Sequence, residues 1–493
     1  MTKRKIACFQ FTSNSIQFAT SLEILDLLNS EYDSGYYFWW GSSTRYPSRM
    51  NRGYYDLAIF PLFRLKIRRR VKTFLQSFSV RFSSRIRVKP RQIKEQVDDF
   101  LKQVSLFTDI KQLQTVVSNG IAPGSALANA YVSETGSRTF DFQKHRHLIR
   151  LLLESYVLVF NETYNLICEE EIDTVLIYNG RFLHERAVWD AAKKANIKTL
   201  VFETTRNRYH LRQDKGFHDR IVNQQWMLEN WKELLATHSK AEVLAWGQKY
   251  FKELESSRNI HYRNAVFQKP IKPYFAFFSN SDDEAVGFWE TWSESFMDQV
   301  ELLSELQKYF ESQNIFHLVI RLHPNLKSKG EWERSRWSTI ASGRNCTVID
   351  ADSAVSSYEI LKNASGVISF GSTIGLEAAF NRIPSCVLAD CWYDELGAAD
   401  KLFSFEALLH WIEIASQNIS EEEMEQRFEA SLVRGLWLEK AGRNFRQATM
   451  TELSWGAWEV EKIGSVKLTE TIVLRSLSIL TNRFVRKCRG LGS

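Results

Sequence analysis

The sequence predicts an α/β protein with two doubly wound domains facing a cleft, helical insertions and a C-terminal helix. Two series of short apolar runs indicate this class. Each run is followed by an amphipathic segment, which is the pattern of βαβ units in a parallel sheet. One series ends near residue 215, and the other begins at Pro273. A chain of 493 residues is also too long for one ordinary core.

The first domain is expected over residues 1–265. Apolar and aromatic runs predict its strands at residues 6–9, 36–40, 55–60, 173–178 and 197–204. Amphipathic segments predict helices at residues 16–28, 183–195 and 223–259. A basic and helical insertion occupies residues 61–170. Residues 206–214 are expected to form a loop at the carboxyl end of the last strand.

The second domain is expected over residues 266–415. Its strands are predicted at residues 274–278, 316–321, 347–349, 366–369 and 383–388. Helices are predicted at residues 294–312, 355–364, 405–416 and from Thr373 onward. Residues 416–493 are expected to form C-terminal helices that pack on the first domain or on a membrane.

The stretch Ser369-Phe-Gly-Ser-Thr-Ile-Gly-Leu-Glu377 links a predicted buried strand to a predicted helix through a loop of small residues. Such a junction favours anion binding, because the first backbone N–H groups of a helix lack helical partners and the helix dipole attracts negative charge. The candidate phosphate ligands are Ser369, Ser372, Thr373 and Gly375. Glu377 is one turn further on and is a candidate acceptor of hydrogen bonds from a ribose diol.

A second motif, Arg321-Leu-His-Pro324, follows another predicted buried strand. Ligands of open α/β sheets bind outside the carboxyl ends of the strands, so both motifs are expected at the same crevice. Arg321 and His323 suit a phosphate, and the two motifs together indicate a nucleotide-sugar site. Candidate contacts to the nucleotide or to an acceptor are Ser279, Asn280, Tyr358, Asn179 and Arg181, although core packing is an equal alternative for Tyr358.

These motifs, with Pro384, resemble those of nucleotide-sugar glycosyltransferases with the GT-B fold, in particular bacterial capsule polysaccharide biosynthesis proteins of the Kdo-transferase type. Asn179-Gly-Arg181 and Phe202-Glu203 resemble the same group more loosely. The resemblance implies two Rossmann-like domains, with the donor on the second and the acceptor on the first. It also implies that His323 contacts the donor phosphate and assists the leaving group as an acid, and that Glu203 deprotonates the acceptor hydroxyl.

Glu203 departs from the pattern of that group, because Thr204 and Thr205 follow it where paired acids and a glycine are common. An ion pair with Arg181 or Arg206 is the structural alternative for this side chain. Glycosyl transfer needs a base near the acceptor hydroxyl and positive charge or a proton donor near the departing phosphate. We therefore expect catalysis by Glu203 and His323 with no metal and no cofactor.

The resemblance implies a glycosyltransferase that acts on a surface polysaccharide or glycolipid, with a CMP-linked acidic sugar as the first expectation for the donor. Two alternatives stay open on the same scaffold. One is a UDP-sugar 2-epimerase or a glycerophosphate transferase, although the Asp-Ser-Gly-Gly loop usual in the epimerases is absent. The other is a sugar-binding scaffold protein without catalysis. Fold alone does not decide among them.

Two stretches are rich in Lys and Arg, residues 61–94 and 472–489, within a net charge of +6. Apolar and aromatic residues alternate with the charges, so an anionic membrane surface is one candidate partner and a solvated protein surface is the alternative. No recognition motif for nucleic acid accompanies the charge. Six scattered cysteines and no long apolar run favour a cytoplasmic protein, with peripheral association with the inner face of the membrane as a further expectation.

Overall fold

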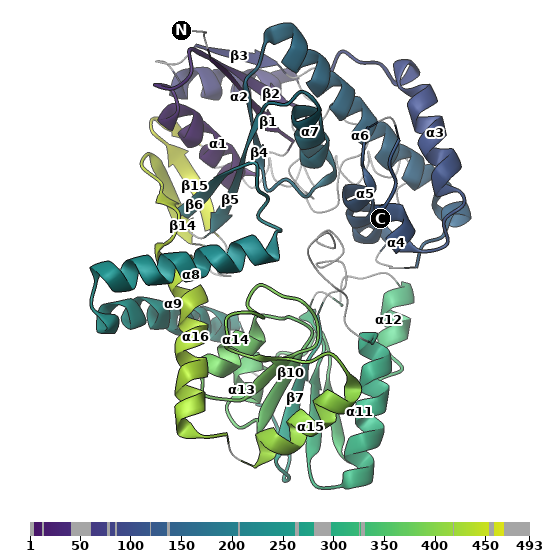
Figure 1. The fold of residues 1–493 in the computed structure, drawn as a ribbon, viewed down its shortest axis with the longest axis vertical. Coiled ribbons are helices and arrows are strands. Elements are labelled where there is room, and N and C mark those ends of the chain that lie inside the picture. The colour runs from purple at the N-terminus through teal and green to yellow at the C-terminus, as the bar shows by residue number, and fades with distance from the viewer. Residues whose placement is uncertain are drawn as a thin grey trace. The chain divides into compact units, whose positions relative to one another are not determined.

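The computed structural model describes most of the chain, namely residues 4–11, 14–40, 61–75, 79–83, 86–118, 120–135, 139–205, 208–261, 266–280, 297–324, 326, 331–417, 419–452 and 458–467. The expected strand at 55–60, Arg206 and the basic C-terminal helix lie outside the described residues. The chain divides into two compact units (Figure 1). Unit 1 comprises Met1–His218 and Gly442–Ser493, and unit 2 comprises Asp219–Ala441.

The sheet of unit 1 has seven strands within the described residues, in the order β13-β6-β5-β4-β1-β2-β3. The strands from β5 to β3 are parallel, whereas β6 and β13 are antiparallel additions. Because the order reverses between β1 and β4, the carboxyl ends of these two strands form a topological switch point. The strands are β1 Lys5–Gln10, β2 Ser34–Trp39, β3 Val80–Ser83, β4 Thr174–Tyr178, β5 Lys198–Thr205, β6 Arg208–Gln213 and β13 Arg443–Asn444.

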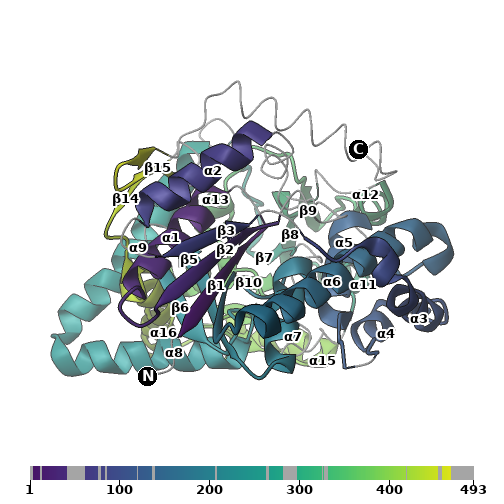
Figure 2. The same ribbon diagram turned by 90° about the horizontal axis from the view of Figure 1, so that it is seen from above.

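Helices cover both faces of this sheet (Figure 2). Helix α1 begins where Asn14 Oδ1 accepts a hydrogen bond from the Ile16 amide at 2.9 Å, and it packs on one face of β4 and β5. Helix α7 follows β4 directly and packs on the same strands and on α6. The helices of this unit are α1 Ser15–Leu27, α2 Pro61–Phe74, a 3₁₀ turn at Pro90–Gln92, α3 Lys94–Val104, α4 Ile110–Gln114, α5 Gly124–Thr135, α6 Phe142–Glu170 and α7 Leu183–Lys194.

The C-terminal part of the chain returns to unit 1 as a small antiparallel sheet, made of β14 Ala448–Glu452, β15 Trp458–Ile463 and β16 Val466–Lys467. Strand β15 packs on α1, and Val460 and Ile463 share a core with Leu22. The buried carboxylate of Glu23 accepts a hydrogen bond from the Arg446 amide. The core of unit 1 is therefore completed by contacts between two segments that are more than 400 residues apart in the sequence.

Part of the first basic stretch is helix α2. Val71 and Leu75 are buried in the core of unit 1, while Arg68, Arg69 and Lys72 are exposed. The helix thus joins the core with one side and presents cations on the other. None of the described helices is both long enough and apolar enough to span a bilayer.

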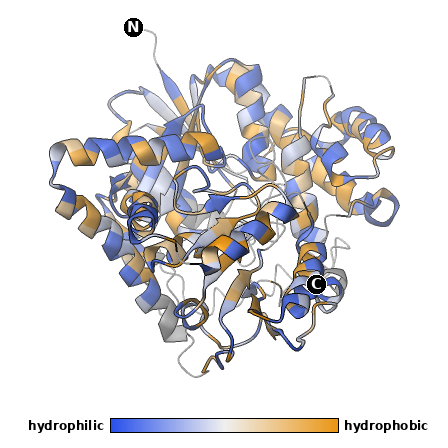
Figure 3. Ribbon diagram, turned by 60° about the horizontal axis from the view of Figure 1, so that its bottom comes forward, coloured by the Kyte–Doolittle hydropathy of each residue, from blue (hydrophilic) through white to orange (hydrophobic). Residues whose placement is uncertain are grey.

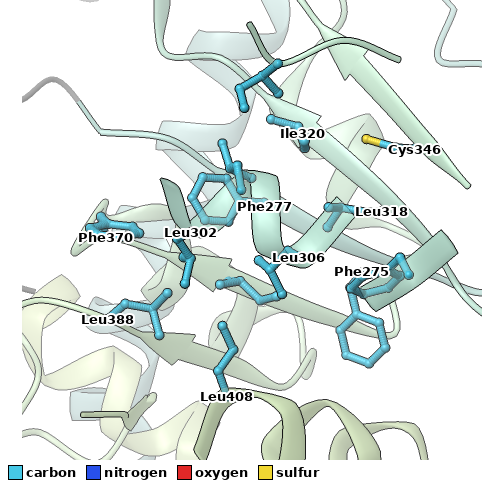
Figure 4. Packing of buried hydrophobic residues seen from close by; sticks show 14 of the residues in the cluster. Phe275, Phe277, Leu302, Leu306, Leu318, Ile320, Cys346, Phe370, Leu388 and Leu408 are labelled. Carbon is cyan, nitrogen blue, oxygen red and sulfur yellow. The ribbon is translucent and has the colours of Figure 1, made fainter. Parts of the chain in front are cut away.

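The sheet of unit 2 has six parallel strands within the described residues, in the order β12-β11-β10-β7-β8-β9. The switch point lies between β7 and β10. Both faces are buried: Phe275 and Phe277 pack with Leu302 and Leu306 on one face (Figure 4), and Tyr274 and Ala276 belong to a second cluster. The strands are β7 Tyr274–Phe278, β8 His317–Arg321, β9 Cys346–Ile349, β10 Gly366–Ser369, β11 Ser385–Val387 and β12 Asp400–Lys401.

The helices of unit 2 are α8 Arg220–Thr237, α9 Lys240–His261, α11 Gln299–Gln313, α12 Glu331–Trp337, α13 Ser357–Leu361, α14 Ile374–Phe380, α15 Phe405–Ser416 and α16 Glu421–Lys440. In Figure 3 the helices alternate between hydrophilic and hydrophobic residues, as expected for helices that bury one side. Helices α9 and α16 cross closely at two glycines. A Cβ atom on Gly435 would lie only 2.7 Å from the Gly247 carbonyl oxygen.

The topology confirms the expected α/β class with two doubly wound sheets. The division between the units differs from the expected boundary near residue 265, since α8 and α9 pack on α16 in unit 2. The expected loop at 206–214 is also different: residues 208–213 form β6, and Glu203 is paired with His210 across the β5–β6 ladder. The hairpin adds an antiparallel edge to the parallel sheet.

Candidate functional site

The loop after β10 is fixed by the segment that follows β11. Gly371 has a φ of +85°, and a Cβ atom there would lie 2.8 Å from the Cys391 Cβ. The Tyr393 hydroxyl donates a hydrogen bond to the Ser372 carbonyl oxygen at 2.5 Å. A Cβ atom on Gly375 would lie 2.4 Å from that hydroxyl oxygen. The two glycines are therefore required for the close approach of this segment.

The carboxyl ends of β7, β8 and β10 are tied to one another at the switch point of unit 2. The His323 amide donates a hydrogen bond to Ser279 Oγ at 2.8 Å. Asn280 Nδ2 donates to the Phe370 carbonyl oxygen at 3.2 Å. The structure thus brings Ser279, Asn280 and His323 together with the loop after Phe370. The side chain of His323 is half-buried.

The hydroxyl-bearing residues of the loop differ in their exposure. Ser372 and Thr373 are half-buried, whereas Ser369 and Glu377 are buried. Thr373 Oγ1 donates a hydrogen bond to Glu377 Oε1 at 3.2 Å. Ser372 and Thr373 are therefore better placed to contact a ligand than the two buried residues. Phosphate binding by Ser369 and ribose binding by Glu377 stay predictions.

Arg321 and Tyr358 have contacts inside unit 2. The guanidinium of Arg321 donates to the carbonyl oxygens of Asp350 and Ser353, the second at 3.1 Å, and only 3% of the residue is exposed. These bonds hold the turn after β9. Tyr358 packs in the cluster that contains Tyr274. Their surroundings fit a supporting role at this edge of the sheet.

A buried network of charges, which sequence reasoning missed, holds the segment that carries Tyr393. Arg220, the first residue of α8, contacts Asp394 at 2.8 Å and Asp390 at 3.2 Å. Lys401 contacts the same two carboxylates, at 2.7 Å for Asp394. The carboxylates alone were visible in the sequence, but nothing local pairs them with an arginine 174 residues away.

In unit 1, Glu203 lies near the carboxyl end of β5. Asn179 Nδ2 donates a hydrogen bond to Glu203 Oε2, and the Thr204 amide donates to Oε1 at 2.9 Å. Burial raises the pKa of Glu203, and these hydrogen bonds and the charge of Arg181 lower it in part. Arg181 lies over the Phe182 ring, with its guanidinium carbon 4.7 Å from the centroid. The structure therefore places Asn179 and Arg181 close to Glu203, whereas their contact with a ligand and the role of Glu203 as a base stay predictions.

The turn after β4 explains the sequence Asn-Gly. Asn179 and Gly180 both have positive φ values, 52° and 84°. A Cβ atom on Gly180 would lie 2.5 Å from the Trp189 ring. The tight turn starts α7 close to the sheet, so that its first turn lies at the switch point.

Two residues of this first turn, His184 and Glu185, were not singled out from the sequence. Both are buried. Burial raises the pKa of Glu185 to about 8 and lowers the pKa of His184 to about 3. At neutral pH both side chains are therefore uncharged. A buried carboxyl with such a pKa, at the carboxyl edge of a parallel sheet, is a candidate functional group.

No protein-family model matches the chain, and no curated protein matches it in sequence. It is similar in structure to a β-Kdo 2,7-transferase, KpsC of Thermosulfurimonas dismutans, with 14% identity, a TM-score of 0.33, and coverage of 59% of this chain and 87% of the other. It is also similar to UDP-GlcNAc 2-epimerase of Methanocaldococcus jannaschii in complex with UDP-GlcNAc and UDP, with 12% identity, a TM-score of 0.34, and coverage of 87% and 99%. The calicheamicin glycosyltransferase is similar at 12% identity and a TM-score of 0.28, with coverage of 90% and 96%.

These solved structures have GT-B type folds, the type that the sequence motifs resemble. Among the residues that the structure describes, no three His, Cys, Asp or Glu side chains are grouped in a way that could hold a metal ion.

Proposed function

We propose that the protein is a glycosyltransferase that uses a nucleotide-sugar donor. The observation that carries this proposal is the joining of three strand ends at the switch point of unit 2, where His323, Asn280 and the loop Gly371–Thr373 meet. Open parallel sheets bind nucleotides at this point. The half-buried hydroxyls of Ser372 and Thr373 and the imidazole of His323 are suitable groups for a diphosphate or phosphodiester.

The proposed reaction forms a bond between the acceptor oxygen and the anomeric carbon of the donor sugar, and it breaks the bond between that carbon and the phosphate oxygen. Glu203 takes the proton from the acceptor hydroxyl. His323 gives a proton or a hydrogen bond to the departing phosphate oxygen. A general base or a general acid typically raises a reaction rate by about 10²- to 10⁴-fold, and we expect a contribution of this order from each of the two residues.

The surroundings of Glu203 support its role as the base. Burial raises its pKa toward the operating pH, which increases the basicity of the carboxylate. The hydrogen bonds from Asn179 and from the Thr204 amide fix the orientation of the carboxylate. Asn179 is in this view a positioning residue, and Arg181 contributes positive charge.

A CMP-linked acidic sugar is the donor that we propose first, and a polysaccharide or lipid-linked glycan is the proposed acceptor. An anionic membrane surface is a further proposed partner. The exposed Arg68, Arg69 and Lys72 of α2 support it, because cations on one side of a membrane-adjacent helix attract anionic lipids.

Thermal unfolding of the full chain with CMP, UDP, GDP or CDP tests the donor site. A ligand at a hundred times its dissociation constant stabilises the folded protein by about 2.7 kcal/mol. We expect one nucleotide to raise the Tm, and His323→Ala to reduce the shift. His410→Ala is the matched control, because His410 is an exposed histidine of the same unit. No shift with any nucleotide, or equal shifts in both variants, would overturn the proposal.

Product analysis separates transfer from epimerisation. The protein is incubated with the nucleotide sugar whose nucleotide raises the Tm, with and without glycan acceptors. Release of the free nucleotide together with a glycosylated acceptor is the expected result. An isomerised nucleotide sugar without any transfer would instead identify an epimerase.

A further inference from the structure

Residues 390–395 follow β11 and contact both the loop after β10 and helix α8. Two of them meet the loop. A Cβ atom on Gly371 would lie 2.8 Å from the Cys391 Cβ, and the Tyr393 hydroxyl donates a hydrogen bond to the Ser372 carbonyl oxygen at 2.5 Å. The position of the proposed donor loop therefore depends on the position of this segment.

Gln224, in the second turn of α8, makes three hydrogen bonds to the same segment. Its Nε2 donates to Asp394 Oδ1 at 2.7 Å and to the Cys391 carbonyl oxygen at 3.3 Å. Its Oε1 accepts a hydrogen bond from the Glu395 amide at 2.7 Å. Gln224 is only 2% exposed, so water does not readily replace these bonds. One side-chain amide thus holds both the backbone and a carboxylate of the segment.

Arg220, one turn earlier in α8, adds charge to this attachment. Its guanidinium contacts Asp394 at 2.8 Å and Asp390 at 3.2 Å. Arg220 and Gln224 are four positions apart, so they lie on the same side of the helix and meet Asp394 together. Helix α8 itself packs on α9 and α16. The segment is therefore attached to a helix that is fixed in unit 2.

The residues that meet α8 and the residues that meet the loop are neighbours in the sequence. Asp394 bonds to Gln224, and Tyr393 bonds to the loop. A planar peptide bond joins these two residues and fixes their Cα atoms about 3.8 Å apart. A shift of Asp394 therefore also moves Tyr393, and with it the bond to Ser372.

We propose that Gln224 is a positioning residue for nucleotide binding, because it holds residues 390–395 where Tyr393 and Cys391 can fix the loop at 371–373. The proposal rests on the proposed function and deepens it, since it assigns control of the donor site's affinity to a residue outside the motifs. Gln224 is buried and acts on the nucleotide only through the segment. By linkage, nucleotide binding also stabilises the bonds between Gln224 and the segment.

Gln224→Met removes the three hydrogen bonds and keeps the length of the side chain. We expect the Kd of the nucleotide that raises the Tm to increase by about 5- to 10-fold. Calorimetric titration of the full chain, well below the unfolding midpoint, measures this change. An unchanged Kd in the folded variant would overturn the proposal.

Gln307→Met is the matched control. Gln307 belongs to α11 of the same unit, and its Nε2 donates a hydrogen bond to the Ala341 carbonyl oxygen at 2.7 Å. This substitution also removes a bond from a glutamine amide to the backbone of another segment. We expect it to lower the Tm without changing the Kd of the nucleotide. An equal increase in Kd in both variants would show a general effect of lost stability and would refute a positioning role.

A double-mutant cycle tests the route through the segment. If Gln224 acts through Tyr393, the variant that combines Gln224→Met with Tyr393→Phe should bind the nucleotide about as weakly as the weaker single variant. Independent effects would instead multiply, to a loss of about 25- to 100-fold. Multiplied effects would therefore refute the proposed route.

Hydrogen exchange of the wild type, followed by mass spectrometry, tests the same coupling without any substitution. With saturating nucleotide, amides of residues 220–227 and 390–395 should exchange more slowly than without it. Residues 338–342, which include the partner of Gln307, are the internal control and should not change. Slower exchange confined to the loop at 371–373 would contradict the reciprocal coupling.

The wild type separates this proposal from the proposed function. A wild type that binds no nucleotide would refute the donor site itself. Nucleotide binding that is equally strong in the wild type and in Gln224→Met would refute the positioning role alone.

Discussion

The hydroxyl of Tyr393 donates a 2.5 Å hydrogen bond to the carbonyl oxygen of Ser372. This bond joins the loop after β10 to the segment after β11, and Gly375 leaves the space that the tyrosine occupies. The proposed donor loop therefore depends on a residue that does not itself belong to the motif. Tyr393 is fully buried, so its effect on a ligand is one of positioning.

Tyr393→Phe should weaken nucleotide binding by about 5- to 10-fold and lower the free energy of unfolding by roughly 1 kcal/mol, since the loop loses one hydrogen bond and the ring stays. Titration of the nucleotide identified by thermal unfolding measures the first effect, and urea denaturation measures the second. Tyr309→Phe, on α11 of the same unit, is the control. Unchanged nucleotide affinity in Tyr393→Phe would show that the loop does not need this bond.

Gly371→Ala and Gly397→Ala form a matched pair. Both glycines have a positive φ, +85° and +81°, so both substitutions carry the same backbone strain of about 1 kcal/mol. Only the new Cβ at position 371 meets another atom, the Cys391 Cβ at 2.8 Å. Gly371→Ala should therefore destabilise the protein further and weaken nucleotide binding. Equal denaturation midpoints for the two variants would contradict the tight packing of the loop.

Arg220→Ala should lower the free energy of unfolding by about 3 kcal/mol, because it removes one of the cations that pair with the buried carboxylates of Asp390 and Asp394. Replacing the pair together, as Arg220→Met with Asp394→Leu, should recover part of this loss, since apolar groups need no partner. Chemical denaturation of the two variants measures the difference. A double variant that is less stable than Arg220→Ala would contradict the stabilising ion pair between Arg220 and Asp394.

Glu185→Gln should change how stability depends on pH. The pKa of Glu185 in the folded protein is raised to about 8. Its stabilising contribution is therefore complete when the pH lies below the ordinary pKa of a glutamate, and it is lost as the pH rises to 8. A shift of this size corresponds to at most about 5 kcal/mol. Between pH 5 and pH 9 the wild type should lose more stability than the variant. Urea denaturation at several pH values tests this, with the exposed Glu95→Gln as the control.

His184→Phe should act in the opposite pH range. The pKa of His184 is lowered to about 3, so its stabilising contribution is complete above pH 6.5 and is lost as the pH falls toward 3. The variant should therefore unfold at a lower pH than the wild type. Acid titration followed by circular dichroism measures the two midpoints. Identical acid midpoints would mean that His184 is more accessible to solvent than the structure shows.

The central strands could be predicted closely from the sequence. Tyr274–Phe278 and Gly366–Ser369 are observed with the predicted bounds, because continuous apolar runs are typical of parallel strands buried on both faces. Strand β6 was not predicted. Its residues are mostly polar, and they form a strand because the edge of β5 offers a ladder to them. The pairing of β6 with β5 depends on the tertiary structure, so the local sequence pattern does not predict it.

The candidate site was predictable in part for a similar reason. His323, Ser279 and Asn280 follow strand ends, and topology alone brings strand ends together. The residues that hold the neighbouring loop lie in segments without a motif: Tyr393 bonds the Ser372 carbonyl oxygen, and Arg220 pairs with Asp394 next to that tyrosine. Arg321 suits an anionic ligand by residue type, yet its guanidinium donates to the backbone carbonyl oxygens of Asp350 and Ser353, contacts that the sequence pattern does not predict.

The chain leaves unit 1 at His218 and re-enters it at Gly442, so unit 2 is one continuous insertion. During synthesis, unit 2 has all its residues before unit 1 does. The core around α1 stays open until β15 arrives, because Val460 and Ile463 complete it. Unit 2 can thus fold first, and a chain that stops short of residue 442 would carry the complete sheet of unit 2 and an incomplete unit 1.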